Sequence, residues 1–340
     1  MIDSSQTPPP RRMASTSTLV KSLLKIAFAG GLISWMVSQG HLNFSHVGAL
    51  LSPTTLVVAL ALVCTSFCIN SYRWLLLLRA QSINISYLYA IKLTFIGSFF
   101  NFFMPGGVGG DVMKGYYLIR EFPQKRASGA ISIILDRILG LYNMVLIGLI
   151  ALLINREFVF QTTELKTLFF SVLLVFVGFS IVMALSFSRR VNRLVGPALE
   201  GLPLGKQMRK IYDAFHAFRN HIRTLVAGLL LSSGSLFFSM AMFWWASRFI
   251  DGGTQLDVSK LLFIVPLGMI ATALPISPAG IGVGQAAFLV LTNWSLGTQS
   301  SIGADLVTGF QMITFILGAL GAIPYFRMKA PSPKEALDVG

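Results

Sequence analysis

A glycine-rich run at 104–111, followed by Lys114, is the first group of residues whose types and spacing suit chemistry. Glycines allow successive backbone N–H groups to converge on one anion, and a helix that begins after them suits a phosphate. Lys114 would add a cation one turn later, and Asp111 would orient Lys114 or relay a proton. Alternatively, Asp111 only caps the helix that follows. The predicted phosphate site contains Gly106, Gly107, Gly109, Gly110, Asp111 and Lys114.

An acidic and a basic residue, Asp136 and Arg137, lie side by side in the apolar stretch 127–154. A helix rises 1.5 Å per residue, so the pair would lie roughly 15 Å deep in a bilayer. Charges at this depth need partners or water. Neighbouring residues point about 100° apart on a helix, so each should pair with another group. The candidate cross-pairs are Asp111 with Arg137 and Lys114 with Asp136, either as a structural lock or as a polar pathway for a lipid headgroup.

A second glycine-rich segment at 277–285 resembles the first, because Pro-x-Gly-(Val/Ile)-Gly begins at both Pro105 and Pro278. Irregular backbone at membrane depth persists only where protein buries it or water reaches it. Two such breaks in corresponding halves are typical of transporters built as inverted repeats, with the binding site near the midplane. The residues assigned to this second site are Pro278, Gly280, Gly282 and Gln285.

The composition determines which elements must position these residues. The 340-residue chain is 54% hydrophobic and 12% charged, against roughly 25% charged in a soluble domain. The sequence therefore predicts a polytopic α-helical membrane protein. Its 27 Lys and Arg against 13 Asp and Glu indicate cytoplasmic loops and anionic lipid headgroups, and no nucleic acid. No P-loop, HExxH, nucleophile elbow or Cys/His cluster occurs, so we predict no catalytic residue, metal or cofactor.

The spans follow from apolar length. About 20 apolar residues are needed to cross a bilayer as a helix. Three apolar pieces, 88–103, 259–274 and 281–294, are too short or too broken for this. Six stretches qualify: 19–38, 54–79, 127–154, 167–187, 224–250 and 302–326.

The distribution of basic residues predicts the topology. If 88–103 crossed once, the basic segments 114–126 and 189–223 would lie outside, against the positive-inside rule. The conflict disappears if 88–118 and 259–294 each enter the membrane and return to the same face. We therefore predict six spans, two oppositely oriented re-entrant hairpins and an inverted repeat. Arg137 then lies within the membrane, and the residues on the outer side are Arg156, Lys166, Arg248 and Lys260. The other basic residues lie on the cytoplasmic side, Arg73, Arg79 and Lys92 among them.

The expected domain organisation is simple. One integral-membrane domain covers 19–327, and its cytoplasmic loop 189–223 contains an amphipathic, basic helix. Residues 1–18 and 328–340 are predicted as cytoplasmic tails, the first of them disordered. Both termini should therefore face the cytoplasm.

Three motifs in order resemble the lysylphosphatidylglycerol synthase transmembrane-region family, also called flippase-like or UPF0104. These are residues 103–111, the run Ser132-x-x-x-Asp136-Arg137-x-x-Gly140-Leu141, and residues 275–282, with Arg73-Trp74-Leu75 as further support. The resemblance covers about 20–327. In bifunctional members this region is fused to an aminoacyl-tRNA-dependent transferase and moves the aminoacylated lipid between leaflets. The transferase is not expected in this stand-alone chain. Two positions depart from the family pattern, which often has Arg at Lys114 and Glu at Gln285.

The resemblance and the buried charges imply a bacterial inner-membrane flippase or transporter in cell-envelope lipid or glycolipid metabolism. Its substrate would be an anionic phospholipid or a polyprenyl-linked lipid or glycolipid, and an envelope-lipid synthase is a candidate partner. One alternative is a non-transporting protein that presents lipid to a separate enzyme. Another is a membrane enzyme that uses Asp111 and Asp136 on a lipid headgroup.

Overall fold

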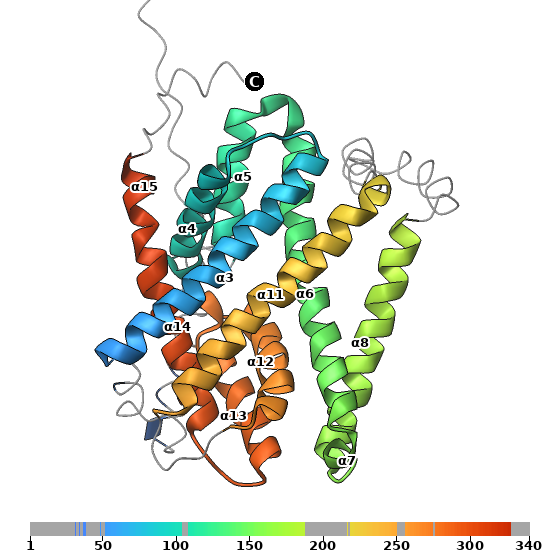
Figure 1. Ribbon diagram of the computed structural model, residues 1–340, viewed down its shortest axis with the longest axis vertical. Coiled ribbons are helices and arrows are strands. Elements are labelled where there is room, and N and C mark those ends of the chain that lie inside the picture. The colour runs from blue at the N-terminus through green and yellow to red at the C-terminus, as the bar shows by residue number, and fades with distance from the viewer. Residues whose placement is uncertain are drawn as a thin grey trace, which may run out of the picture.

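The computed structural model describes residues 52–103, 108–187, 218–249, 256–274 and 276–327, together with six isolated positions outside these ranges. Within these ranges the chain forms α-helices and short 3-10 helices and no strand (Figure 1). The all-α prediction is therefore confirmed for this part of the chain. Four predicted features lie outside the described residues, namely the span 19–38, both tails, and most of the loop 189–223.

Five long apolar helices form the frame of the molecule. At 1.5 Å per residue, even the shortest of them, with 19 residues, extends about 28 Å, close to the thickness of a bilayer core. They agree with five of the six predicted spans. The helices are α3 (Pro53–Ala80), α6 (Arg126–Ile154), α8 (Thr163–Phe187), α11 (Ile222–Ser247) and α14 (Ile302–Leu320).

The five frame helices are long and apolar enough to cross a membrane, and so is a sixth segment, Pro278–Leu296. The sequence had indicated that 281–294 was too short. The difference arises because a 3-10 turn, η3 (Pro278–Gly280), precedes α13 (Val283–Leu296). Gly282 separates the two with a φ of 85°, a conformation that favours glycine. The continuous α-helix itself has only 14 residues.

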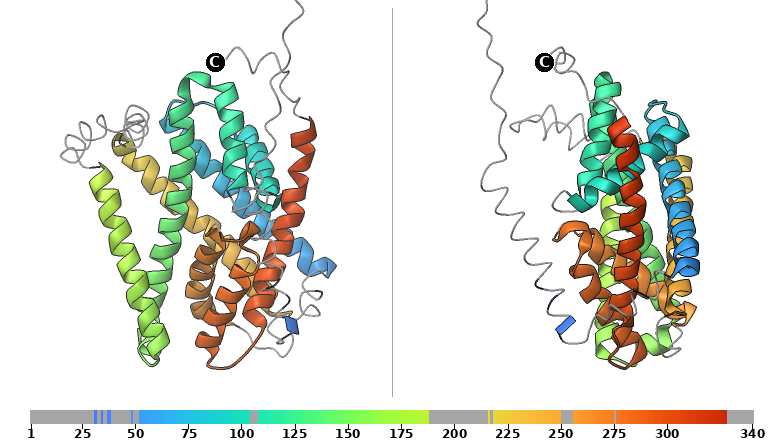
Figure 2. Two further views of the ribbon diagram at one scale, coloured as in Figure 1. Left: turned by 180° about the vertical axis from the view of Figure 1, so that it is seen from behind. Right: turned by 90° about the vertical axis from the view of Figure 1, so that its left-hand side faces the viewer.

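Four shorter helices form two pairs. The first helix pair is α4 (Tyr87–Phe103) with α5 (Gly109–Glu121), and the second is α12 (Val258–Ala273) with α13. The members of each pair pack on one another, and α4 also contacts η3. The first pair lies in one half of the molecule and the second in the other (Figures 1 and 2). The end of α4 therefore meets the turn of the second pair between the two halves.

The remaining elements are short connections. They are η1 (Pro123–Lys125), α7 (Arg156–Val159), η2 (Phe218–His221) and α15 (Ala322–Arg327). Among the long helices, α3 and α11 cross one face side by side, and α6 contacts α3, α5, α11, α12 and α8 (Figures 1 and 2). Helix α6 therefore connects the helix pairs to the frame.

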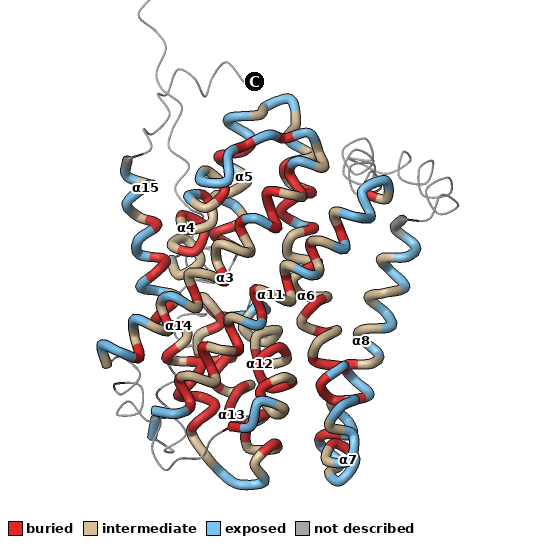
Figure 3. The backbone as a smooth tube through the Cα atoms, viewed as in Figure 1, coloured by how far each residue is buried: buried red, intermediate tan, exposed pale blue. Residues whose placement is uncertain are grey.

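The surface is apolar where lipid would be expected. Along α8, Leu174 is 74% exposed and Val182 is 59% exposed. Figure 3 shows that buried residues gather in the centre, while α8 is mostly exposed or half-buried. A soluble monomer rarely exposes apolar area on this scale. Together with the six apolar helices, this supports a multi-pass membrane protein.

Candidate functional site

A cavity of about 290 Å³ lies where the two helix pairs meet. Its wall combines charged, amide and hydroxyl groups with aromatic and aliphatic side chains. The wall includes residues of α3, α4, α6, α12, η3 and α14, so all of these elements position it. Its polar side chains are Arg73, Ser98, Asn101, Asp136, Arg137, Thr272, Gln311 and Thr314.

Arg137 of this wall pairs with Asp111 at the start of α5. The distance from Arg137 Nε to Asp111 Oδ2 is 2.8 Å, and the two side chains are 37% and 27% exposed. This cross-pair was predicted from the sequence and is confirmed. The alternative in which Asp111 caps the helix is wrong, because α5 begins at Gly109 with Val108 at the N-cap position.

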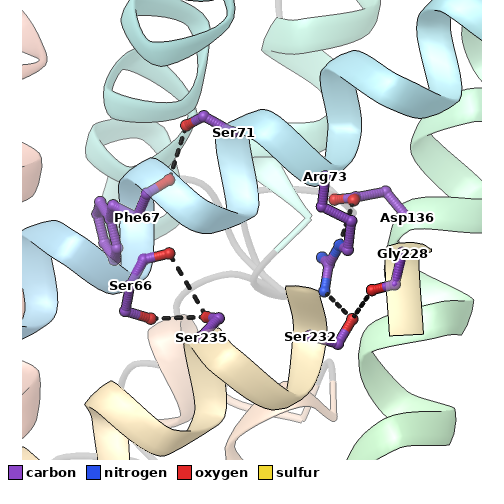
Figure 4. A network of polar contacts seen from close by, with 8 residues as sticks. All are labelled: Ser66, Phe67, Ser71, Arg73, Asp136, Gly228, Ser232 and Ser235. Atoms are coloured by element: carbon purple, nitrogen blue, oxygen red, sulfur yellow. Dashed lines mark hydrogen bonds and ion pairs between the residues drawn. The ribbon is translucent and has the colours of Figure 1, made fainter. Parts of the chain in front are cut away.

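Asp136 pairs with Arg73 and not with Lys114, so the second predicted cross-pair is wrong. Arg73 Nε donates to Asp136 Oδ1 over 2.7 Å, and its Nη1 donates to Ser232 Oγ over 2.7 Å (Figure 4). The topology analysis had counted Arg73 among the basic residues on the cytoplasmic side. Instead it is 7% exposed and lies in α3. Its position inside the apolar stretch 54–79 was the available signal.

Lys114 lies on the face of an aromatic ring. Its Nζ is 4.8 Å from the centre of the Trp74 ring, within the range of a cation–π interaction. Within the described part of the chain, no carboxylate lies within 4.0 Å of this ammonium group. Trp74 is fully buried, and its indole N–H has no hydrogen-bond partner there. Trp74 thus partly offsets the cost of burying the Lys114 charge.

The charges at this site do not cancel. Arg73 adds a third cation to a set in which the sequence analysis had paired two acidic residues with two basic ones. Three cations face two carboxylates among the described residues, which leaves one positive charge in excess. We call this set the charged cluster, and it comprises Arg73, Asp111, Lys114, Asp136 and Arg137.

Close glycine contacts position α5 against α4. A Cβ atom on Gly110 would lie 2.6 Å from the carbonyl oxygen of Gly97, so the two backbones touch here. The Gly110 N–H also donates to Asn101 Oδ1 over 2.7 Å. Gly109 is buried beside it, while Gly106 and Gly107 lie outside the described residues. This contact places Asp111 next to the end of α4.

Gln285 of the second assigned group has a structural role. Its Oε1 accepts from the Gly282 N–H over 2.7 Å, and its Nε2 donates to Gln311 Oε1 over 2.7 Å. Gln285 is 1% exposed, and Gly280, with a φ of 72°, packs against Thr272. Gln285, Gly280, Gly282 and Pro278 therefore shape the turn. The members of this region that line the cavity are Ala279, Thr272, Ala273 and Gln311, which sequence analysis did not assign.

The chain is similar in sequence to UPF0104 membrane proteins. A UPF0104 membrane protein of Methanothermobacter thermautotrophicus is 22% identical over 297 residues, which is 81% of this chain and 86% of the relative. A UPF0104 membrane protein of Pyrococcus horikoshii is 22% identical over 283 residues, 78% of this chain and 84% of the relative. No solved structure matches significantly. The family described as lysylphosphatidylglycerol synthase TM region matches residues 22–321, and the chain belongs to this family.

Proposed function

We propose that this protein binds a lipid phosphate at the charged cluster and moves the lipid between the leaflets of the bacterial inner membrane. The observation that carries the proposal is the excess positive charge of the charged cluster beside a cavity. A phosphodiester carries one negative charge, so a bound lipid would neutralise the cluster. Arginine suits this role because its N–H groups form a planar fork that matches phosphate.

The cavity wall supports a lipid ligand in a second way. Besides its charged groups, the wall contains Phe102, Leu141, Met144 and Phe310. A binding site lined mostly by apolar groups, with a few placed polar ones, is typical of small-molecule sites. A phospholipid has a charged phosphate beside apolar chains, and this wall offers both environments within one cavity.

The same proposal includes a topology. We infer that both helix pairs are re-entrant hairpins, that they enter from opposite faces as an inverted repeat, and that both termini are cytoplasmic. The helices of the pairs have 17, 13, 16 and 14 residues. At 1.5 Å per residue these continuous α-helices extend about 20–26 Å, less than a bilayer core of about 30 Å. Only together with η3 does α13 reach the length of a span. The contact of α4 with η3 supports an encounter near the midplane.

Cysteine accessibility tests this topology. On a background without Cys64 and Cys68, a cysteine at Lys125 should react with a membrane-impermeant maleimide only from the cytoplasmic side. A cysteine at Lys166, between α7 and the apolar part of α8, should react only from the other side. Labelling of Lys125→Cys in intact cells would contradict the re-entrant arrangement.

Reconstitution tests the transport. In liposomes with fluorescent phosphatidylglycerol, the full chain should speed the exchange between leaflets, and Arg137→Gln should slow it at least tenfold, because the phosphate loses a charged donor at the cavity. Arg156→Gln in α7, away from the cavity, is the matched control and should retain the rate. Equal rates for Arg137→Gln and the unchanged protein would refute the proposal. Lipid binding without exchange would favour the non-transporting alternative.

A further inference from the structure

A second cavity of about 160 Å³ adjoins the first. Four residues line both cavities, so the two spaces share part of their walls. The shared residues are Arg73, Gly140, Met144 and Phe310. A lipid whose phosphate lies at the charged cluster would therefore have the second cavity within reach of its headgroup.

The wall of this second cavity combines hydroxyl and amide groups with the apolar side chains of Phe67, Met144, Leu236, Met269 and Phe310, and it is almost uncharged. It contains serine hydroxyls from α3 and α11. Ser66 Oγ shares a hydrogen bond of 2.7 Å with Ser235 Oγ (Figure 4). It shares a second one, of 3.3 Å, with Ser239 Oγ. Two amides, Asn70 and Asn143, complete the polar part. Among the described residues that line this wall, Arg73 is the one charged residue and none is a carboxylate. Hydroxyl and amide groups both donate and accept hydrogen bonds.

Arg73 presents unused donors at the boundary between the cavities. A guanidinium group has five N–H donors, of which Nε is used by Asp136 and one on Nη1 by Ser232. In the described part of the chain, the other three donate to no acceptor. Gly140 lies against the guanidinium, since a Cβ there would be 3.5 Å from Nη1. Because Arg73 lines both cavities, these donors are available to a ligand that enters either space.

We propose that the second cavity binds a neutral, hydroxyl-bearing headgroup of the lipid, of the size of glycerol or one sugar ring. This inference rests on the proposed phosphate site. Hydroxyl oxygens of such a headgroup would accept from Arg73, while its O–H groups would donate to serine and amide oxygens. A cavity of about 160 Å³ has room for roughly five waters, at about 30 Å³ each, which suits a polyol. An ammonium headgroup would find no counter-ion among the described residues of this wall.

The test compares phospholipids that differ only in the headgroup. Each is titrated against the purified full chain in nanodiscs, with phosphatidylmethanol as the reference because it has the same phosphodiester charge and no hydroxyl. Phosphatidylglycerol or phosphatidylinositol should bind about tenfold more tightly than phosphatidylmethanol, since two or more hydrogen bonds are gained. Tighter binding of phosphatidylglycerol would identify a glycerol headgroup, and tighter binding of phosphatidylinositol would identify a ring headgroup. Phosphatidylethanolamine should bind more weakly than phosphatidylglycerol and phosphatidylinositol.

A matched pair of variants locates this preference. The double change Ser235→Ala and Ser239→Ala should reduce the tenfold preference to about twofold or less, without changing the affinity for phosphatidylmethanol. Ser247→Ala removes a buried hydroxyl from the same helix outside both cavities, and it should keep the preference. Equal binding of all anionic lipids to the unchanged protein would overturn the headgroup inference alone. If the Arg137→Gln variant binds these anionic lipids as tightly as the unchanged protein does, the phosphate site itself is overturned.

Discussion

Replacing Arg73 by Met is expected to lower the free energy of unfolding by about 3–5 kcal/mol, because it leaves the buried Asp136 carboxylate without its cation. The side chains of this ion pair are only 9% and 15% exposed. The change can be measured by unfolding the detergent-solubilised protein with increasing amounts of a denaturing detergent. Lys166→Met, an exposed cation of α8, should change stability by less than about 1 kcal/mol.

The paired variant separates a structural role from a functional one. Arg73→Met combined with Asp136→Leu removes both charges and should recover most of the lost stability, since no buried charge remains unpaired. If the charged cluster is the lipid site, this double variant is folded but does not move lipid. A double variant that is both stable and fully active would contradict the proposed site and leave the ion pair a purely structural lock.

Gly110→Ala is expected to have the second large effect. The added Cβ would lie 2.6 Å from the Gly97 carbonyl oxygen and 2.8 Å from its carbonyl carbon. Backbone atoms cannot move aside as a side-chain end can, so α5 must shift away from α4. We expect a loss of about 1–3 kcal/mol of stability. Lipid exchange should fall at least tenfold, because the shift moves Asp111 and Lys114 relative to α6 and α3.

Gly115→Ala is the matched control on the same helix. A Cβ there would meet only Ile133 Cδ1, at 3.7 Å, which is an ordinary contact. Alanine favours a helix over glycine by about 1 kcal/mol, so this variant should be as stable as the unchanged protein or more stable. If both glycine variants lose stability and exchange equally, the Gly97–Gly110 contact does not position the site.

Much of the fold could be predicted from the sequence alone. Apolar length is a local sum, so the spans at 54–79, 127–154, 167–187 and 224–250 needed no knowledge of neighbours, and α3, α6, α8 and α11 agree with them. The Asp111–Arg137 pair could also be anticipated. Both residues lie in apolar segments, where an unpaired charge costs free energy. These segments contain few oppositely charged residues that could act as partners.

The partner of Asp136 and the two cavities could not be predicted from the sequence. Arg73 lies near the end of an apolar stretch, where a long basic side chain commonly extends to the membrane surface, so the sequence favoured a position at the cytoplasmic surface. Which side chains meet depends on how the helices rotate and cross. That geometry is fixed by backbone contacts such as Gly97–Gly110 between residues of different helices. The sequence determined an all-helical membrane protein with charges in its apolar segments. The tertiary structure alone decided the excess cation and the two adjoining cavities, because both arise from packing between distant segments.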